Sequence, residues 1–125
     1  DKVFAFSDIG KQGTYAEYAV VDAPLLSHKP KNINMLEAAA VPLAAVTAWQ
    51  ALTRDGQLTL TNAKDKKVLI QNASGGVGGF AVQIASYLGA HVIASASGVK
   101  EDYVKSLGAD EFIDYKTHRR AYWSR

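Results

Sequence analysis

The chain has 125 residues, of which 48% are hydrophobic and 21% are charged, a composition that is ordinary for a globular domain. Its formal net charge of +2 is too small to predict a nucleic-acid partner. The absence of cysteine excludes disulfides and thiol catalysis and fits a reducing compartment, so we expect a cytoplasmic protein. No apolar stretch approaches the roughly 18 residues needed to cross a bilayer, so we expect no membrane span. Because the chain begins at Asp1 rather than at methionine, a removed targeting segment, and with it an organellar location, stays open.

The beginning of the chain predicts β-structure. Residues 2–6 and 14–21 alternate in character or contain β-branched and aromatic side chains, and a turn at residues 10–13 separates them. This pattern predicts two antiparallel strands. Pro24 and Pro30 then break regular structure.

An apolar helix is predicted next. Residues 36–52 are rich in alanine and leucine and have helical character, but Pro42 lies inside the stretch and predicts an interruption there. The apolar character suggests an element buried between two lobes. Residues 55–67 are polar and predict a connecting loop.

A glycine-rich turn at residues 72–79, Asn-Ala-Ser-Gly-Gly-Val-Gly-Gly, follows the apolar run of residues 68–70 and precedes an amphipathic stretch. Gly75 and Gly78 have the spacing of the second and third glycines of the dinucleotide-binding fingerprint, with Ala73 in place of the first. In that fingerprint the second glycine lets the backbone approach a pyrophosphate and the third lets the helix pack close to the strand. The free N–H groups and the dipole of the helix start attract the anion. The alternative is a tight surface loop with no ligand.

The elements around the turn predict an α/β fold. They alternate as strand 68–71, helix 77–88, strand 91–95, helix about 100–107 and strand 111–115. This order is the first half of a Rossmann dinucleotide-binding domain, which normally has six parallel strands. With three strands only, strand 68–71 keeps an open apolar edge, so we expect the isolated chain to form concentration-dependent oligomers.

The end of the second predicted strand bears on the choice of dinucleotide. NAD-binding domains carry an acid about 20 residues after the glycines, where it binds the ribose hydroxyls. Here the chain offers Ser95, Ser97 and Lys100 instead, two hydroxyls and a cation that suit a 2'-phosphate. We therefore predict NADPH rather than NADH. The alternative is that Ser97 caps the next helix and Lys100 is a solvated charge.

Four ordered blocks carry a resemblance to a family. They are Gly-Thr-Tyr-Ala-Glu-Tyr-Ala-Val from Gly13, Ala-Ala-Ala-Val-Pro-Leu-Ala-Ala-Val-Thr-Ala-Trp-Gln-Ala-Leu from Ala38, the glycine turn with its helix, and residues 107–115. The chain resembles medium-chain dehydrogenases/reductases of the zinc-free quinone oxidoreductase branch, similar to zeta-crystallin, over residues 1 to about 116. The resemblance implies that residues 1–42 are the end of a GroES-like β-barrel catalytic lobe and residues 43–125 the first half of the Rossmann domain. It also implies a fragment of a longer enzyme that is a homodimer at full length.

The resemblance assigns roles to individual residues. The pyrophosphate turn would be formed by Ser74, Gly75, Gly76, Val77 and Gly78. Thr47 would lie by the nicotinamide, while Lys100 and Tyr115 would bind the 2'-phosphate. Without the resemblance, a hydroxyl bonded back to its own helical turn would be the preferred interpretation of Thr47, and a ring at a strand end that of Tyr115.

Zinc chemistry is disfavoured by the residues present. The zinc-binding branch of the family uses cysteine ligands, and Leu43 stands where one of them is expected. The three histidines, His28, His91 and His118, lack metal-ligand spacing. Hydride transfer from the nicotinamide to a quinone or an α,β-unsaturated carbonyl requires no metal. No proton donor is identified, and Glu17 and Tyr18 are better explained as barrel structure.

Two functions stay open at this stage. The first is an NADPH-dependent quinone or enone oxidoreductase, for the full-length parent, with the isolated chain inactive. The alternative is a non-catalytic nucleotide-binding or structural protein of the same fold. Residues 117–125 depart from the family pattern, with three arginines and two aromatic residues where a polar helix is expected.

Overall fold

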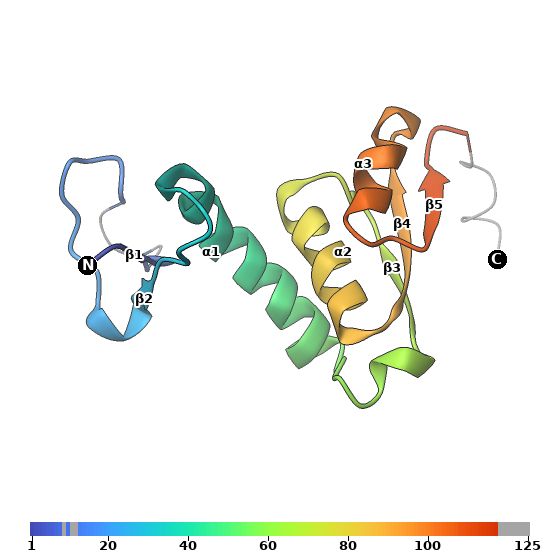
Figure 1. Ribbon diagram of the computed structural model, residues 1–125, viewed down its shortest axis with the longest axis horizontal. Coiled ribbons are helices and arrows are strands. Elements are labelled where there is room, and N and C mark those ends of the chain that lie inside the picture. Colours follow the sequence, from blue (N-terminus) through green and yellow to red (C-terminus); the bar gives the residue numbers. More distant parts are fainter. Residues whose placement is uncertain (9, 11–12, 118–125) are drawn as a thin grey trace. The chain divides into compact units, whose positions relative to one another are not determined.

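The computed structural model describes residues 1–8, 10 and 13–117 of the chain. Two compact units, Asp1–Leu43 and Ala44–Arg125, are distinguished by their internal contacts. Helix α1 (Met35–Gln50) begins in the first unit and ends in the second. Figure 1 shows the elements in chain order. The prediction about residues 117–125 falls, except for Thr117, outside the described residues.

The first unit contains one short antiparallel pair of strands. β1 (Val3–Phe4) pairs with β2 (Ser27–His28), so the predicted pairing of residues 2–6 with residues 14–21 is wrong. Residues 14–21 form no strand, and their large side chains stand in solvent, as Tyr15 shows. A strand is stabilised by its hydrogen-bonded neighbours, and this segment has none beside it in the described part of the unit.

Helix α1 begins at a capping box. The Asn34 side-chain oxygen accepts the Glu37 N–H at 2.9 Å, and the Glu37 carboxylate accepts the Asn34 N–H at 2.8 Å. This reciprocal pair satisfies two N–H groups that a helix start otherwise leaves without partners. The helix then continues through Pro42, so the predicted interruption is wrong. The proline removes one backbone hydrogen bond, and strong helix formers on both sides of it sustain the rest of the ladder.

A π-helical turn, η2 (Ala51–Asp55), extends α1 without a break. Among the described residues, the continuous 21-residue stretch Met35–Asp55 is long and apolar enough, by length and composition alone, to cross a membrane, since an 18-residue window within it has a mean hydropathy of 1.3. The expectation that no apolar stretch has this length is therefore wrong. A core helix of a globular domain meets the same criterion, and here Ala48 belongs to the hydrophobic core of the second unit and Leu52 packs against that core.

The segment between η2 and the sheet is more ordered than the predicted loop. It contains the short 3-10 helix η3 (Ala63–Asp65). Leu58 and Ala63 are buried in the core, and Gln57 adopts a left-handed φ of 52° at the turn. These two buried side chains attach the segment to the domain, while Leu60 between them is 68% exposed.

The second unit contains a three-stranded parallel sheet in the order β3-β4-β5. Its elements are β3 (Lys67–Ile70), α2 (Gly76–Leu88), β4 (His91–Ala96), η4 (Gly98–Lys100), α3 (Glu101–Ser106) and β5 (Glu111–Asp114). Ile70 pairs with Ala94, and Ala96 pairs with Asp114, so the carboxyl ends of the strands meet at one edge. The α/β class and the parallel sheet typical of a Rossmann half are confirmed.

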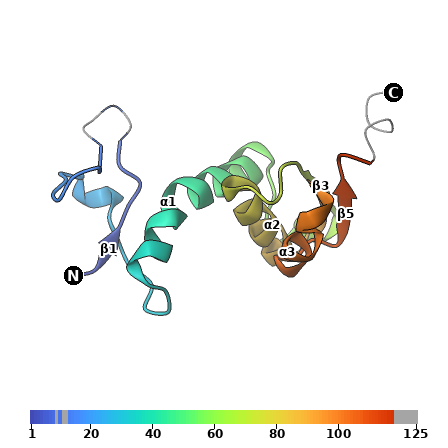
Figure 2. The same ribbon diagram turned by 90° about the horizontal axis from the view of Figure 1, so that it is seen from above.

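Helices α2 and α3 lie on the same face of this sheet (Figures 1 and 2). Burial alternates along β4, so that Val92 and its even-numbered neighbours face the helices. Val82 of α2 and Val104 of α3 are fully buried against it. On the opposite face Leu69 of β3 is 42% exposed. The sheet face covered by α2 and α3 thus contains the hydrophobic core, and within the described chain no helix covers the other face.

Candidate functional site

The glycine turn between β3 and α2 is held by backbone hydrogen bonds. The N–H of Ala73 donates to the Ser95 carbonyl at 2.9 Å, which ties the turn to β4. The N–H of Gly75 donates to the Asn72 carbonyl at 2.9 Å. Asn72 itself has a left-handed φ of 51°, a conformation that asparagine adopts more readily than most residues. The chain therefore reverses sharply after the strand and enters the helix at Gly76.

The glycines of the turn differ in the space that they leave for a side chain. A Cβ added to Gly78 would lie 2.1 Å from the Asn72 carbonyl oxygen and 2.9 Å from the Ala73 Cα. One added to Gly75 would lie 2.8 Å from the Asn72 side-chain nitrogen. One added to Gly76 would meet nothing closer than the Ala44 Cβ at 3.9 Å. Gly78 is thus required by the packing of the turn, whereas packing within the chain does not require Gly76.

The amino end of α2 has the electrostatic character of an anion site. No acidic residue lies in its first turn, and no side chain caps it. Its first N–H groups and its dipole therefore present partial positive charge that the helix's own first turn leaves uncompensated. The predicted pyrophosphate residues Ser74, Gly75, Gly76, Val77 and Gly78 all lie in this turn or in the first helical turn after it.

Thr47 lies on α1, in the part of the helix that belongs to the second unit. Ala44, three residues earlier, is the side chain that faces the Cβ position of Gly76. Residues three apart share a helix face, so Thr47 lies on the face of α1 that runs past the glycine turn. The helix is held there by the buried Ala48.

The predicted 2'-phosphate residues lie at the carboxyl edge of the sheet. Ser95 is in β4 on the face opposite the helices, and Ser97 follows the strand at the amino end of η4. The Ser97 carbonyl accepts the Lys100 N–H at 2.8 Å, but the Ser97 hydroxyl makes no capping hydrogen bond. The N–H of Tyr115 donates to the Ala96 carbonyl at 3.3 Å, which brings Tyr115 beside the end of β4. The same edge thus gathers Ser97, Lys100 and Tyr115.

The structure adds one residue that sequence reasoning missed. A Cβ on Gly98 would lie 2.6 Å from Oδ2 of Asp114, so the Asp114 carboxylate lies against the turn that follows β4. The ribose-binding acid of NAD-binding domains is expected at the end of β4, where this chain has none. Asp114 ends the neighbouring strand and pairs with Ala96. In a parallel sheet the ends of adjacent strands are neighbours, so an acid that ends the next predicted strand is the sequence signal for this residue.

Histidine and carboxylate side chains pair at the opposite edge of the sheet. His91 Nε2 lies 2.6 Å from Glu111 Oε1, and Asp110 accepts the Val92 N–H at 2.7 Å. These contacts join the amino ends of β4 and β5, away from the glycine turn. Within the described ranges, no group of three or more His, Cys, Asp or Glu side chains has an arrangement that would hold a metal ion. His118 lies outside those ranges.

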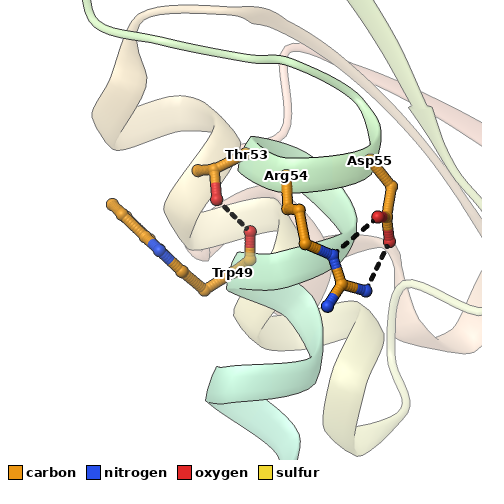
Figure 3. A network of polar contacts seen from close by, with 4 residues as sticks. All are labelled: Trp49, Thr53, Arg54 and Asp55. Carbon is orange, nitrogen blue, oxygen red and sulfur yellow. Dashed lines mark hydrogen bonds and ion pairs between the residues drawn. The ribbon is translucent and has the colours of Figure 1, made fainter.

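The carboxyl end of the long helix carries a small polar network, shown in Figure 3. Thr53 Oγ1 donates to the Trp49 carbonyl at 2.8 Å, and Arg54 donates to both carboxylate oxygens of Asp55, at 2.8 and 3.2 Å. The hydrogen bond from Arg54 holds the pKa of the exposed Asp55 carboxyl below its usual value, and the Arg54 pKa is raised in turn. The Trp49 side chain points away from this ion pair (Figure 3). These contacts lie within residues 49–55, at the π-helical turn, and none of them involves a residue of the glycine turn.

A parallel β-α-β-α-β unit with a glycine turn between its first strand and helix is typical of the dinucleotide-binding class of α/β domains. Residues 76–124 match the family model described as "Zinc-binding dehydrogenase". The chain is 45% identical over 117 residues to the mitochondrial NAD(P)H oxidoreductase RTN4IP1 of Homo sapiens, covering 94% of this chain and 30% of that protein. It is 45% identical over 118 residues to the chloroplastic quinone-oxidoreductase homolog of Spinacia oleracea, covering 94% of this chain and 36% of that one.

A solved structure agrees with these relatives. The quinone oxidoreductase from Thermus thermophilus, described together with its NADPH complex, superposes with a TM-score of 0.72 at 36% identity, over 84% of this chain and 34% of that chain. In sequence and in fold, the chain is similar to quinone oxidoreductases of the medium-chain dehydrogenase/reductase superfamily. It spans about a third of the length of these relatives.

Proposed function

We propose that the protein to which this chain belongs is an NADPH-dependent oxidoreductase that transfers hydride to a quinone or an α,β-unsaturated carbonyl without zinc. The glycine turn carries this proposal. Gly78 is required by the fold, but packing within the chain leaves the Cβ position of Gly76 open, at the amino end of a helix whose first turn has no acid. An open glycine at this point is what the approach of a pyrophosphate requires.

Each end of the cofactor has candidate partners. The N–H groups of Gly76 and Val77 would bind the pyrophosphate, with Ser74, Gly75 and Gly78 shaping the turn. Thr47, on the α1 face that runs past this turn, would lie by the nicotinamide. The nicotinamide supplies the hydride, and the protein positions it and excludes water.

The preference for NADPH rests on the carboxyl edge of the sheet. Ser97, Lys100 and Tyr115 gather there, and the Ser97 hydroxyl is not used as a helix cap. Ser95 lies on the opposite face of β4, so it would contribute less directly. The relatives are named for NAD(P)H or quinone, and the Thermus structure is described with NADPH, which supports a nicotinamide cofactor of this kind.

A zinc-free reaction is proposed from the residues present. The chain contains no cysteine, although the family model that it matches is described as zinc-binding. Leu43, at the position where a ligand cysteine is expected, cannot bind a metal. A conjugated acceptor such as a quinone is already activated toward hydride, so no Lewis acid is needed.

We further propose that residues 1–42 belong to the catalytic lobe and residues 43–125 to the nucleotide-binding lobe. The division of the structure between Leu43 and Ala44 supports this boundary.

The relatives are named as mitochondrial and chloroplastic, so an organellar location is the alternative to the expected cytoplasmic one. Cell fractionation would distinguish the two locations. A homodimer at full length also remains a proposal.

The second candidate is a non-catalytic nucleotide-binding protein. The glycine turn is compatible with it as well, because a turn that binds a pyrophosphate does so whether or not a substrate site is present. Calorimetric titration of the folded chain with NADPH and, separately, with NADH tests the nucleotide site that both candidates share. Saturable binding that favours NADPH supports the site, and absence of binding by a folded chain contradicts it. Quinone-dependent oxidation of NADPH by the full-length protein then separates the enzyme from the non-catalytic candidate.

A further inference from the structure

An acid lies at the edge of the sheet where the proposed 2'-phosphate residues gather. The Asp114 carboxylate faces Gly98, which lies between Ser97 and Lys100 in the chain, and Tyr115 follows Asp114 directly. The backbone of this corner is fixed on both sides. Asp114 pairs with Ala96 in the sheet, and its Oδ1 accepts the Lys116 N–H at 2.9 Å. The strand pairing places the Asp114 backbone beside the end of β4, and the carboxylate lies against the turn at Gly98.

This acid has the chemistry that recognises a ribose without a phosphate. A carboxylate accepts hydrogen bonds from ribose hydroxyls, and NAD-binding domains use an acid at the carboxyl edge of the sheet for this purpose. Such an acid ordinarily ends the second strand of the fold. Here β4 ends in Ala96, and the acid comes from β5, one strand further along the sheet.

The same carboxylate opposes a 2'-phosphate. Two negative groups a few ångströms apart repel each other, and at a partly solvated sheet edge the penalty amounts to roughly fivefold or more in affinity. Lys100 attracts a phosphate at this edge and Asp114 repels it. This edge of the sheet therefore contains one residue that favours the phosphorylated cofactor, Lys100, and one that favours the unphosphorylated cofactor, Asp114.

We propose that Asp114 is a specificity-determining residue that binds the ribose hydroxyls of the unphosphorylated cofactor and limits the preference for NADPH. This inference rests on the proposed nucleotide site and refines its cofactor choice. It makes the chain a dual NADPH and NADH binder in which Lys100 and Asp114 act in opposite directions.

Two small ligands test binding of the adenosine part of the cofactor without the nicotinamide part. Adenosine 2',5'-bisphosphate carries the 2'-phosphate, and adenosine 5'-monophosphate carries the free ribose hydroxyl. The variant Asp114→Asn keeps an oxygen that can accept the Lys116 N–H, so the turn is preserved while the charge is lost. Asp114→Ser is a second variant with a smaller acceptor. Glu111→Gln is the matched control, since it removes one negative charge from the other end of the same strand.

Calorimetric titration of the chain and its variants with both probes gives the ratio of the two affinities, and circular dichroism verifies folding. We expect Asp114→Asn and Asp114→Ser to shift this ratio roughly fivefold or more toward the bisphosphate. Glu111→Gln should leave it unchanged. An unchanged ratio in the Asp114 variants, or an equal loss of both probes, would overturn the inference and leave the nucleotide site intact. Failure of the folded wild-type chain to bind either probe would overturn the proposed nucleotide site and this inference together.

Discussion

Replacing Gly78 by alanine tests whether the glycine turn is fixed by packing. The added Cβ would lie 2.1 Å from the Asn72 carbonyl oxygen and 2.9 Å from the Ala73 Cα, and both are backbone atoms that cannot rotate away. Overpacking of this kind costs about 3 kcal/mol, and the better helix propensity of alanine offsets about 1 kcal/mol of it. We therefore expect the free energy of unfolding to fall by about 2 kcal/mol.

Gly76→Ala is the matched control, because it makes the same substitution in the first turn of the same helix, where the nearest atom would be 3.9 Å away. It should be neutral or slightly stabilising. Urea denaturation followed by circular dichroism measures both variants at the same protein concentration. If Gly78→Ala is as stable as Gly76→Ala, the close approach of the turn to α2 is not what requires glycine, and the packing argument fails.

Three further predictions concern the cofactor edge, the helix start and the open sheet face. Lys100→Ala in the full-length protein should weaken NADPH roughly tenfold while changing NADH little, by fluorescence titration, and equal losses would contradict the 2'-phosphate assignment. Asn34→Ala removes half of the capping box of α1 and should lower the free energy of unfolding by about 1 kcal/mol in urea, whereas an unchanged midpoint would show that the cap is not used. Leu69→Lys places a charge on the exposed face of β3 and should reduce self-association in sedimentation velocity runs; oligomers that persist unchanged would place the contact elsewhere.

Local signals in the sequence were sufficient to predict the α/β half of the chain. The run of β3, the glycine turn and the amphipathic α2 follow in order, and each predicted boundary lies within one or two residues of the observed one. Gly89, at the end of α2, has a left-handed φ of 93°, as its position after the helical pattern indicates. These features depend on neighbouring residues, so a short window of sequence contains them.

Features that depend on distant partners were not predicted. Residues 14–21 have the pattern of a strand, but a strand requires a neighbour to pair with, and the described chain gives them none. Pro42 was expected to interrupt α1, yet the helix tolerates the loss of one hydrogen bond. The position of Asp114 beside Gly98 was not predicted, because it follows from the register of β4 and β5. No single segment of the sequence determines that register.

The hydrogen bond from the Ala73 N–H to the Ser95 carbonyl joins the start of the glycine turn to the strand that leads to the cofactor edge. It uses backbone atoms only, so the distance between the two places does not depend on the identity of any side chain. In the proposed nucleotide site, pyrophosphate binding at the glycine turn and ribose selection at the sheet edge would therefore be separable by substitution. At the proposed site, substitutions at the ends of β4 and β5 would change the cofactor preference while leaving the glycine turn and its backbone hydrogen bond to β4 in place.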